Sequence, residues 1–153
     1  MRSLLLVAAF FLGSCFLQNQ AAVARLGDSV NGLADETRWG RTELAVDRVA
    51  TEYRAKFLES HRRWGRDFQI ADTDIQRMLI DEETDNATVV VIVSWYDMRS
   101  MEANLTTIQQ KWITAGRGFI LESEEVVEGN AALIAVPVVA GETTQASASS
   151  TDG

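Results

Sequence analysis

The sequence NATVVVIVSWY, residues 86–96, decides the expected fold of this chain. In a β-strand its side chains alternate between two faces, and both faces are apolar. One face carries Val89, Val91, Val93 and Trp95, and the other carries Val90, Ile92, Ser94 and Tyr96. A strand that is apolar on both faces belongs inside a sheet with cover on both sides. We therefore expect residues 86–96 to form a central strand.

Three neighbouring segments also show the alternation of β-strands. They lie at residues 74–83, 105–113 and 119–127. An acidic run at residues 81–86 and the sequence AGRG at residues 115–118 form the expected short turns, and strands joined by short turns pair antiparallel. The sequence thus predicts a four-stranded antiparallel meander.

Helical spacing precedes the strands. Residues 30–37 are apolar at helical intervals up to the break at Trp39-Gly40, which fits a short first helix. A second helix is expected from Thr42, a suitable N-cap residue, to Gly65. Its apolar face comprises Val46, Val49, Ala50, Tyr53, Phe57, His61 and Trp64. Two helices packed on a curved meander make an α+β fold.

The tetrapeptide RWGR occurs twice, at residues 38–41 and 63–66. Arginine beside tryptophan suggests an anion-binding or aromatic-stacking motif. A structural interpretation also exists, in which each copy ends a helix. Glycine then takes the left-handed position, tryptophan closes the core, and arginine complements the negative end of the helix dipole. We favour capping, because both copies fall where the helical pattern stops.

The first fifteen residues, MRSLLLVAAFFLGSC, are typical of an export signal that ends in a lipobox. Arg2 stays on the cytoplasmic side while the apolar run enters the translocon. Cys15, the only cysteine, is then the expected site of lipidation. This interpretation assigns residues 1–14 to a lipoprotein signal peptide and residues 15–27 to an anchor and linker.

Residues 22–24, AVA, provide an alternative site for ordinary signal peptidase, with cleavage after residue 24. The apolar run at residues 4–17 is shorter than the ~20 residues needed to cross the hydrocarbon core, so we expect no membrane-spanning anchor. We expect a lipid-anchored protein of the bacterial cell envelope, in the outer or inner membrane. The alternative is a soluble periplasmic or secreted protein.

Composition excludes several classes of function. The chain carries 22 acidic and 14 basic residues, a formal net charge of −8, and an acidic protein repels nucleic acid. With Cys15 as the only cysteine, the exported domain has neither a disulfide nor a cysteine zinc site. The sequence also lacks the nucleophile elbow, the phosphate-binding glycine loop and the paired-histidine zinc motif. We therefore expect no metal and no cofactor.

Two helices followed by a four-stranded meander resemble the cone-shaped fold of nuclear transport factor 2-like proteins, the group that includes ketosteroid isomerase. The resemblance covers residues 28–127. It is carried by Trp64-Gly65, by ATVVV at residues 87–91, and by QKW at residues 110–112 opposite GFILESE at residues 118–124. In the family a similar hairpin closes the mouth of the cone. The helical part is shorter than in the family's enzymes.

The resemblance directs attention to a pocket of the ketosteroid isomerase kind. Such a pocket needs a carboxylate to move a proton in an apolar cleft, assisted by a phenol or imidazole donor. The candidate residues are Tyr53, His61, Asp74, Tyr96 and Trp112. No spacing among them forms a motif, so we favour a structural interpretation, with His61 partly exposed at a helix end and the tyrosines at the edge of the core. We assign no catalytic residue.

The end of the chain changes character twice. We place the domain at residues 28–128 and expect residues 129–140 to form a fifth, edge strand or a docked tail, because Pro137 cannot donate to a central ladder. Residues 141–153, GETTQASASSTDG, carry no apolar side chain larger than alanine and are expected to be disordered.

Two functional hypotheses follow. The first is a non-enzymatic envelope lipoprotein, a small binding or assembly module for an unidentified protein or small-molecule ligand. The second is a periplasmic enzyme of the isomerase or dehydratase kind that uses the cone as its pocket. Helices on one face of the sheet leave an apolar patch on the other, which either the tail or a second copy of the chain covers. We favour a homodimer through this face.

Overall fold

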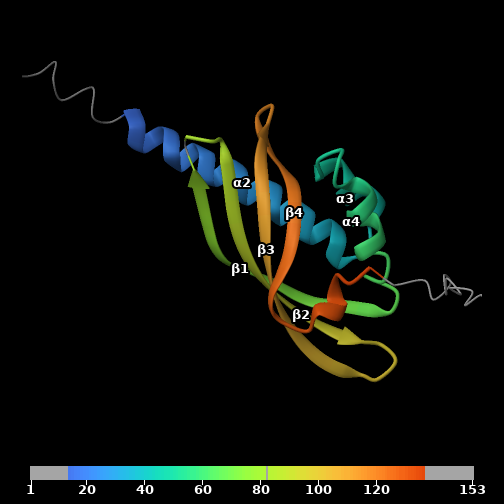
Figure 1. The fold of residues 1–153 in the computed structure, drawn as a ribbon. Helices are drawn as coiled ribbons and strands as arrows, with labels where there is room; N and C mark the ends of the chain where they lie inside the picture. The colour runs from blue at the N-terminus through green and yellow to red at the C-terminus, as the bar shows by residue number, and fades with distance from the viewer. Residues whose placement is uncertain (1–13, 82, 137–153) are drawn as a thin grey trace, which may run out of the picture.

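The computed structural model describes residues 14–81 and 83–136, which form an α+β fold with helices before a four-stranded sheet (Figure 1). The helical segments are α2 (Ser14–Arg38), α3 (Thr42–Ala45), η1 (Val46–Arg48), α4 (Arg54–Ser60) and η2 (Ala131–Leu133). The strands are β1 (Phe68–Asp81), β2 (Asn86–Asp97), β3 (Glu102–Ala115) and β4 (Gly118–Gly129). The expected order of helices followed by strands is confirmed.

The sheet is an open antiparallel meander in the order β1-β2-β3-β4, as the alternating segments predict. Its first strand begins at Phe68, earlier than the expected residue 74. The reason lies in two register shifts, between Ile70 and Asp72 and between Ile75 and Arg77. Each shift breaks the alternation of side chains and hides the strand from a two-residue pattern.

The strand β2 lies between β1 and β3, but its two faces are not equally covered. On the inner face Val89, Val91 and Val93 are fully buried. On the outer face Ile92 is half-buried and Tyr96 is 43 % exposed. The central position of β2 is confirmed, while cover on both faces is absent from the described part of the chain. The outer face of the sheet is open to solvent.

Helix α2 is much longer than expected. It begins at Ser14 and crosses the inner side of the sheet diagonally (Figure 1), so the segment 15–27 belongs to this helix. Leu26 is completely buried, and the Ser29 hydroxyl accepts a hydrogen bond from the Phe119 backbone N–H at 3.2 Å. The short-helix prediction is wrong because residues 15–27 are polar and small on most sides, with few large apolar side chains to mark a face. None of the helices of the described residues is both long and apolar enough to span a bilayer.

The expected second helix is broken into α3, η1 and α4. At Val49 the backbone is extended, which lets the next N–H, that of Ala50, donate to Leu121 of β4 at 2.8 Å. The apolar face itself is confirmed, since Val49, Ala50, Tyr53, Phe57, His61 and Trp64 are all buried. A strand-like contact at the sheet edge therefore replaces continuous helix without changing which side chains enter the core.

The two RWGR turns pack directly on each other. Gly40 and Gly65 both have positive φ, +67° and +70°. Capping is confirmed for Gly40, which follows the end of α2 at Arg38, and is wrong for Gly65, because α4 already ends at Ser60. A Cβ at Gly65 would lie 2.8 Å from the Gly40 Cα, so only glycine permits this contact. Trp64 is buried in the core as expected, but Trp39 is 66 % exposed. The expectation that both tryptophans close the core is wrong for Trp39.

Residues 131–136 form a docked segment and not a fifth strand. Leu133 is completely buried, and its carbonyl accepts a hydrogen bond from the Trp64 indole N–H at 2.8 Å. This contact puts the segment on the inner side of the sheet, so it does not cover the outer face. Residues 137–140 of the expected tail, residues 141–153 and residues 1–13 of the signal lie outside the described residues.

Candidate functional site

His61 is the centre of a buried polar cluster. It follows α4, is 1 % exposed, and lies between the rings of Phe57 and Trp64 at centroid distances of 4.1 and 4.4 Å. The expectation of a partly exposed helix-end histidine is therefore wrong. His61 continues the buried face of Phe57 and Trp64 and enters the core with these aromatic neighbours.

Glu124 of β4 meets His61 inside the core. Its Oε2 lies 3.4 Å from His61 Nε2, and the two side chains are 2 % and 1 % exposed. Gln110 donates from Nε2 to Glu124 Oε1 at 2.9 Å, and Trp112 donates from Nε1 to Gln110 Oε1 at 3.2 Å. Gln110, which Trp112 orients, thus holds one carboxylate oxygen in place. The other oxygen, Oε2, has no hydrogen-bond partner among the described residues.

A bulge explains why the sequence does not reveal Glu124. Phe119 and Leu121 point inward, so strict alternation along β4 would put Glu124 on the outer face. The register shifts between Lys111 and Trp112 of β3, leaving Glu122 as an extra residue in β4. The next residues of β4, from Ser123 to Val126, therefore change face, and Glu124 turns inward. A second shift, between Thr107 and Ile108, restores the original phase. The only unusual feature of Glu124 in the sequence is that it is a charged residue within a strand. Such a residue normally faces solvent, so the sequence does not predict its burial.

Hydrogen bonding determines which nitrogen of His61 carries the proton. Its Nδ1 lies 3.0 Å from the Phe57 carbonyl oxygen, which can only accept, so Nδ1 donates. Ser60 Oγ, which donates to the same carbonyl, lies 3.1 Å from Nδ1. In the neutral imidazole Nε2 then presents a lone pair to Glu124 Oε2. The contact between Nε2 and Oε2 is an ordinary hydrogen bond only when one of the two atoms carries a proton.

Burial controls the charge of the aromatic donors. Desolvation lowers the pKa of His61 below its usual range and outweighs the opposing effects of the Glu124 charge and the Phe57 carbonyl. Burial also raises the pKa of Tyr53 far above its usual range, and the Glu124 charge adds to this effect. At neutral pH both side chains are uncharged, so the cluster presents imidazole and phenol to the carboxyl group.

A small cavity of about 20 Å³ adjoins the cluster. His61, Gln110 and Glu124 line it, together with apolar side chains of α2, β2 and β3 and with Thr37 and Thr73. A water molecule needs about 10–15 Å³ measured in this way, whereas small-molecule pockets have volumes of about 300–1,000 Å³. The cavity therefore accommodates one water, which would supply the donor that Glu124 Oε2 lacks.

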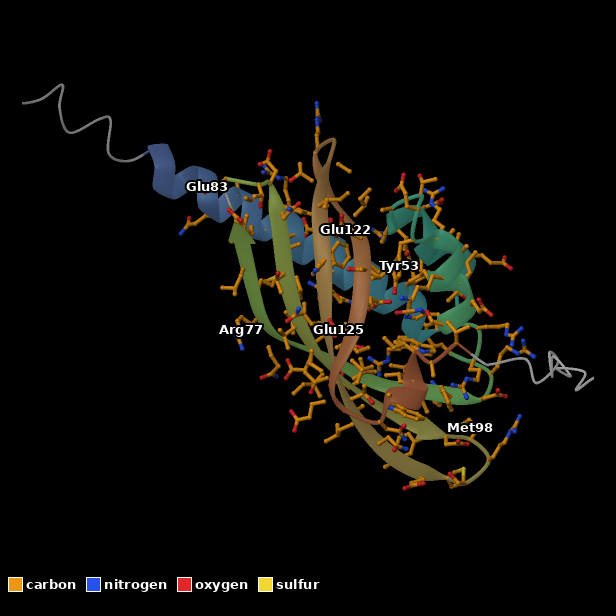
Figure 2. All side chains as sticks on the ribbon, viewed as in Figure 1. Tyr53, Arg77, Glu83, Met98, Glu122 and Glu125 are labelled. Carbon is orange, nitrogen blue, oxygen red and sulfur yellow. The ribbon has the colours of Figure 1, made fainter. Side chains whose placement is uncertain are left out.

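The other candidate pocket residues divide into two groups. Tyr53 and Trp112 are buried beside the cluster, as the pocket hypothesis expects. Asp74 pairs with Ile92 on the outer face and is exposed, and Tyr96 lies on the same face. Their inclusion is wrong, because the sheet separates them from His61. Figure 2 shows Tyr53 on the helical side of the sheet, away from Arg77 of β1.

The cluster can exchange protons but has no room for a substrate beside its reactive atoms. Among the described residues no group of three histidine, cysteine, aspartate or glutamate side chains is placed to hold a metal ion. Comparison of the chain with protein-family models, curated proteins and solved structures found no match.

The buried His61 predicts a loss of stability in mild acid. The unfolded chain binds a proton at His61 near pH 6.5, whereas the folded chain does so only at lower pH, so acid favours unfolding. The free energy of unfolding should fall by up to about 1.4 kcal/mol per pH unit below pH 6.5 from this group alone. Urea titrations at pH 7.5, 6.5 and 5.5 measure it.

The matched variant is His61→Gln, which keeps a side-chain donor and cannot titrate. Its stability should depend less steeply on pH between 6.5 and 5.5 than that of the wild type. An identical slope in the two proteins would show that His61 titrates normally in the folded state.

Proposed function

We propose that the chain is a non-enzymatic binding or assembly module, held at the bacterial cell envelope by a lipid on Cys15. The non-enzymatic role rests on the small size of the cavity at the acid–base cluster, about 20 Å³. A reaction there would require substrate within hydrogen-bond distance of His61 Nε2 or Glu124 Oε2. Space for one water supports a structural role for the pair, and binding then belongs to the surface.

We also propose that the domain is related to the cone-shaped nuclear transport factor 2-like fold. The order of helices before an antiparallel meander supports this relationship, and so does a polar cluster between α2 and the inner face of the sheet. Trp112 lies buried in the hairpin β3–β4, near the position that the resemblance implies.

The envelope location rests on the N-terminal signal. Cleavage before Cys15 and the alternative cleavage after Ala24 both leave Leu26 and the rest of the buried face of α2 in the mature protein. The fold is therefore compatible with a lipid-anchored protein in the outer or inner membrane and with a soluble periplasmic or secreted one. The lipobox favours the anchored form.

The competing function is that of a periplasmic isomerase or dehydratase. It is favoured by one observation, which is that His61 and Glu124 line the same cavity and are both buried. An enzyme of this kind would have to open the cavity, most directly where α2 meets Thr73 of β1. The described conformation is the closed one, so the binding module is the better supported function.

A homodimer through the outer face is the assembly that we propose. Across this face runs a row of paired residues, Arg77, Val90, Gln109 and Glu125, one from each strand in order. Arg77 and Glu125 stand at opposite edges of the sheet (Figure 2). A two-fold axis parallel to the strands puts β1 of one copy over β4 of the other and brings each Arg77 toward the partner's Glu125.

The apolar residues between these charges support the same arrangement. Val90 and Ile92 are half-buried on the outer face, and Leu79 and Leu105 are exposed beside them. The strands of two stacked sheets cross at an angle of about 30°. Rows of residues far from the crossing point therefore move apart, and the row at the crossing point makes the closest contacts. This limits repulsion between Asp74 and Glu128, which occupy the two edges of the next row.

Labelling with a radioactive fatty acid in a bacterial host tests the anchor. The wild type should carry label and Cys15→Ala should carry none, because the thiol is the attachment point. Mass spectrometry of the mature N-terminus provides the control. Equal labelling of the two proteins, or an N-terminus at Arg25, would contradict lipidation.

A charge exchange tests the dimer. In sedimentation equilibrium, Arg77→Glu and Glu125→Arg should each weaken association about three- to tenfold, because each puts like charges together. The double variant should restore most of it. Arg117→Glu, in the β3–β4 turn, is the matched control.

Two outcomes would overturn the proposed arrangement. A monomeric wild type would exclude the dimer itself. A wild-type dimer whose affinity is unchanged in both single variants would show that the copies associate through another surface.

A further inference from the structure

The two RWGR turns line a surface groove that the functions discussed above do not use. We call it the RWGR groove, and its volume is about 660 Å³. Its lining consists of Trp39, Gly40, Arg41, Thr42, Glu43, Leu44, Leu58, Arg62, Trp64, Gly65 and Arg66. It lies among the end of α2, α3 and α4. This volume is in the range of small-molecule sites, unlike that of the cavity beside His61.

The groove is positively charged although the chain is acidic. Arg41, Arg62 and Arg66 line it with Glu43 as the only acidic side chain, in a protein of net charge −8. All three arginines are exposed, and none forms an ion pair with another residue of the described chain. Their guanidinium groups are therefore free to bind an anion.

The positive region extends beyond the groove. Arg62 and Arg66 also line a neighbouring depression of about 380 Å³ with Arg63 and Arg99, where Asp67 is the only acidic residue. A planar guanidinium binds carboxylate and phosphate oxygens through two parallel hydrogen bonds. Arginines from two sides of the groove suit an anion with several oxygens better than they suit a single halide ion.

Apolar side chains line the rest of the groove. Trp39 is 66 % exposed, Leu44 54 % and Leu58 38 %, and all three belong to the lining. The Arg38 guanidinium lies 5.8 Å from the centre of the Trp39 ring and helps to orient it. An exposed tryptophan beside free arginines is typical of sites that stack a planar group and neutralise its charge.

The backbone makes this groove rigid. Gly40 and Gly65 touch through their Cα atoms, which fixes the two turns relative to each other. The Arg41 backbone N–H closes the end of α2 by donating to Glu36 at 2.9 Å, and Gly65 donates to Phe68 at 2.8 Å. Because the turns are held before any ligand arrives, little ordering cost opposes binding.

We propose that the RWGR groove binds a small organic anion, a molecule that joins a planar or apolar body to a phosphate or carboxylate group. The body stacks on Trp39 and contacts Leu44 and Leu58, and the anion pairs with Arg62 and with Arg41 or Arg66. This inference rests on the binding function proposed above and gives that module a class of ligand. The first RWGR copy then has two uses, because it ends α2 and also lines the groove.

Isothermal titration calorimetry of the full-length chain with 1-naphthyl phosphate tests the site. Trp39→Ala should weaken binding about fivefold, and Arg62→Gln should weaken it about tenfold, because each removes one half of the recognition. Arg117→Gln, at an exposed arginine of the β3–β4 turn that lines neither the groove nor the proposed dimer face, should bind as the wild type does. Inorganic phosphate should bind at least tenfold more weakly than 1-naphthyl phosphate, since it lacks the stacking group.

Three results would overturn the proposal. One is the absence of binding by the wild type at millimolar 1-naphthyl phosphate. Another is equal affinity of Trp39→Ala, Arg62→Gln and Arg117→Gln, which would place the ligand elsewhere. The third is equal affinity for inorganic phosphate, which would reduce the groove to a nonspecific positive patch.

Vesicles separate a free ligand from a lipid headgroup. Flotation of the Cys15→Ala protein with vesicles of phosphatidylglycerol and phosphatidylethanolamine excludes the lipid anchor from the measurement. Binding to vesicles that Arg62→Gln abolishes, without binding of 1-naphthyl phosphate, would show a membrane contact and contradict a small-molecule site. Fatty-acid labelling and the dimer measurements do not depend on the groove. If the groove binds no ligand, the lipoprotein and assembly proposals therefore still stand.

Discussion

A carboxylate buried in the core is the constraint on which the rest of the structure depends. An uncompensated buried charge is strongly destabilising, so Glu124 requires donors and polar neighbours. Gln110 of β3 supplies a donor, Trp112 orients Gln110, and His61 approaches the second oxygen. The helical layer that carries His61 attaches to β4 through the Ala50 N–H, which donates to Leu121. Glu124 is the one buried acid of the described residues, and the strand that carries it also holds the helical layer.

Much of the fold follows from side-chain periodicity, and the errors come from breaks in it. The segment 86–96 identifies β2 as a strand inside the sheet, but not which of its two apolar faces is the inner one. The apolar face from Val49 to Trp64 is correct although the helix is not continuous. Bulges hide the start of β1 and turn Glu124 inward. Cys15 stays a prediction from its motif. Of the candidate pocket, His61 is predictable because it shares helical spacing with Phe57 and Trp64, whereas Glu124 depends on the bulge and is not.

The interior and the surface of this domain have different roles. Inside, the acid–base pair is enclosed with space for one water, and burial keeps His61 uncharged at neutral pH. Outside, two surfaces lack cover in the described chain: the outer face of the sheet and the groove between the RWGR turns. A lipid anchor would leave both surfaces available for a partner or ligand. We therefore propose binding at the surface, and not catalysis in the core, as the function of this domain.

The protonation of His61 tests most directly whether the pair belongs to the core. Nitrogen-15 NMR of the labelled protein distinguishes the two neutral tautomers from the imidazolium ion. We predict the Nδ1–H neutral form at pH 7, because Nδ1 donates to Phe57, with no cationic form until the pH is well below 6.5. An imidazolium at pH 7, or titration at pH 6.5 or above, would contradict a closed structural pair and favour an acid–base site accessible to solvent.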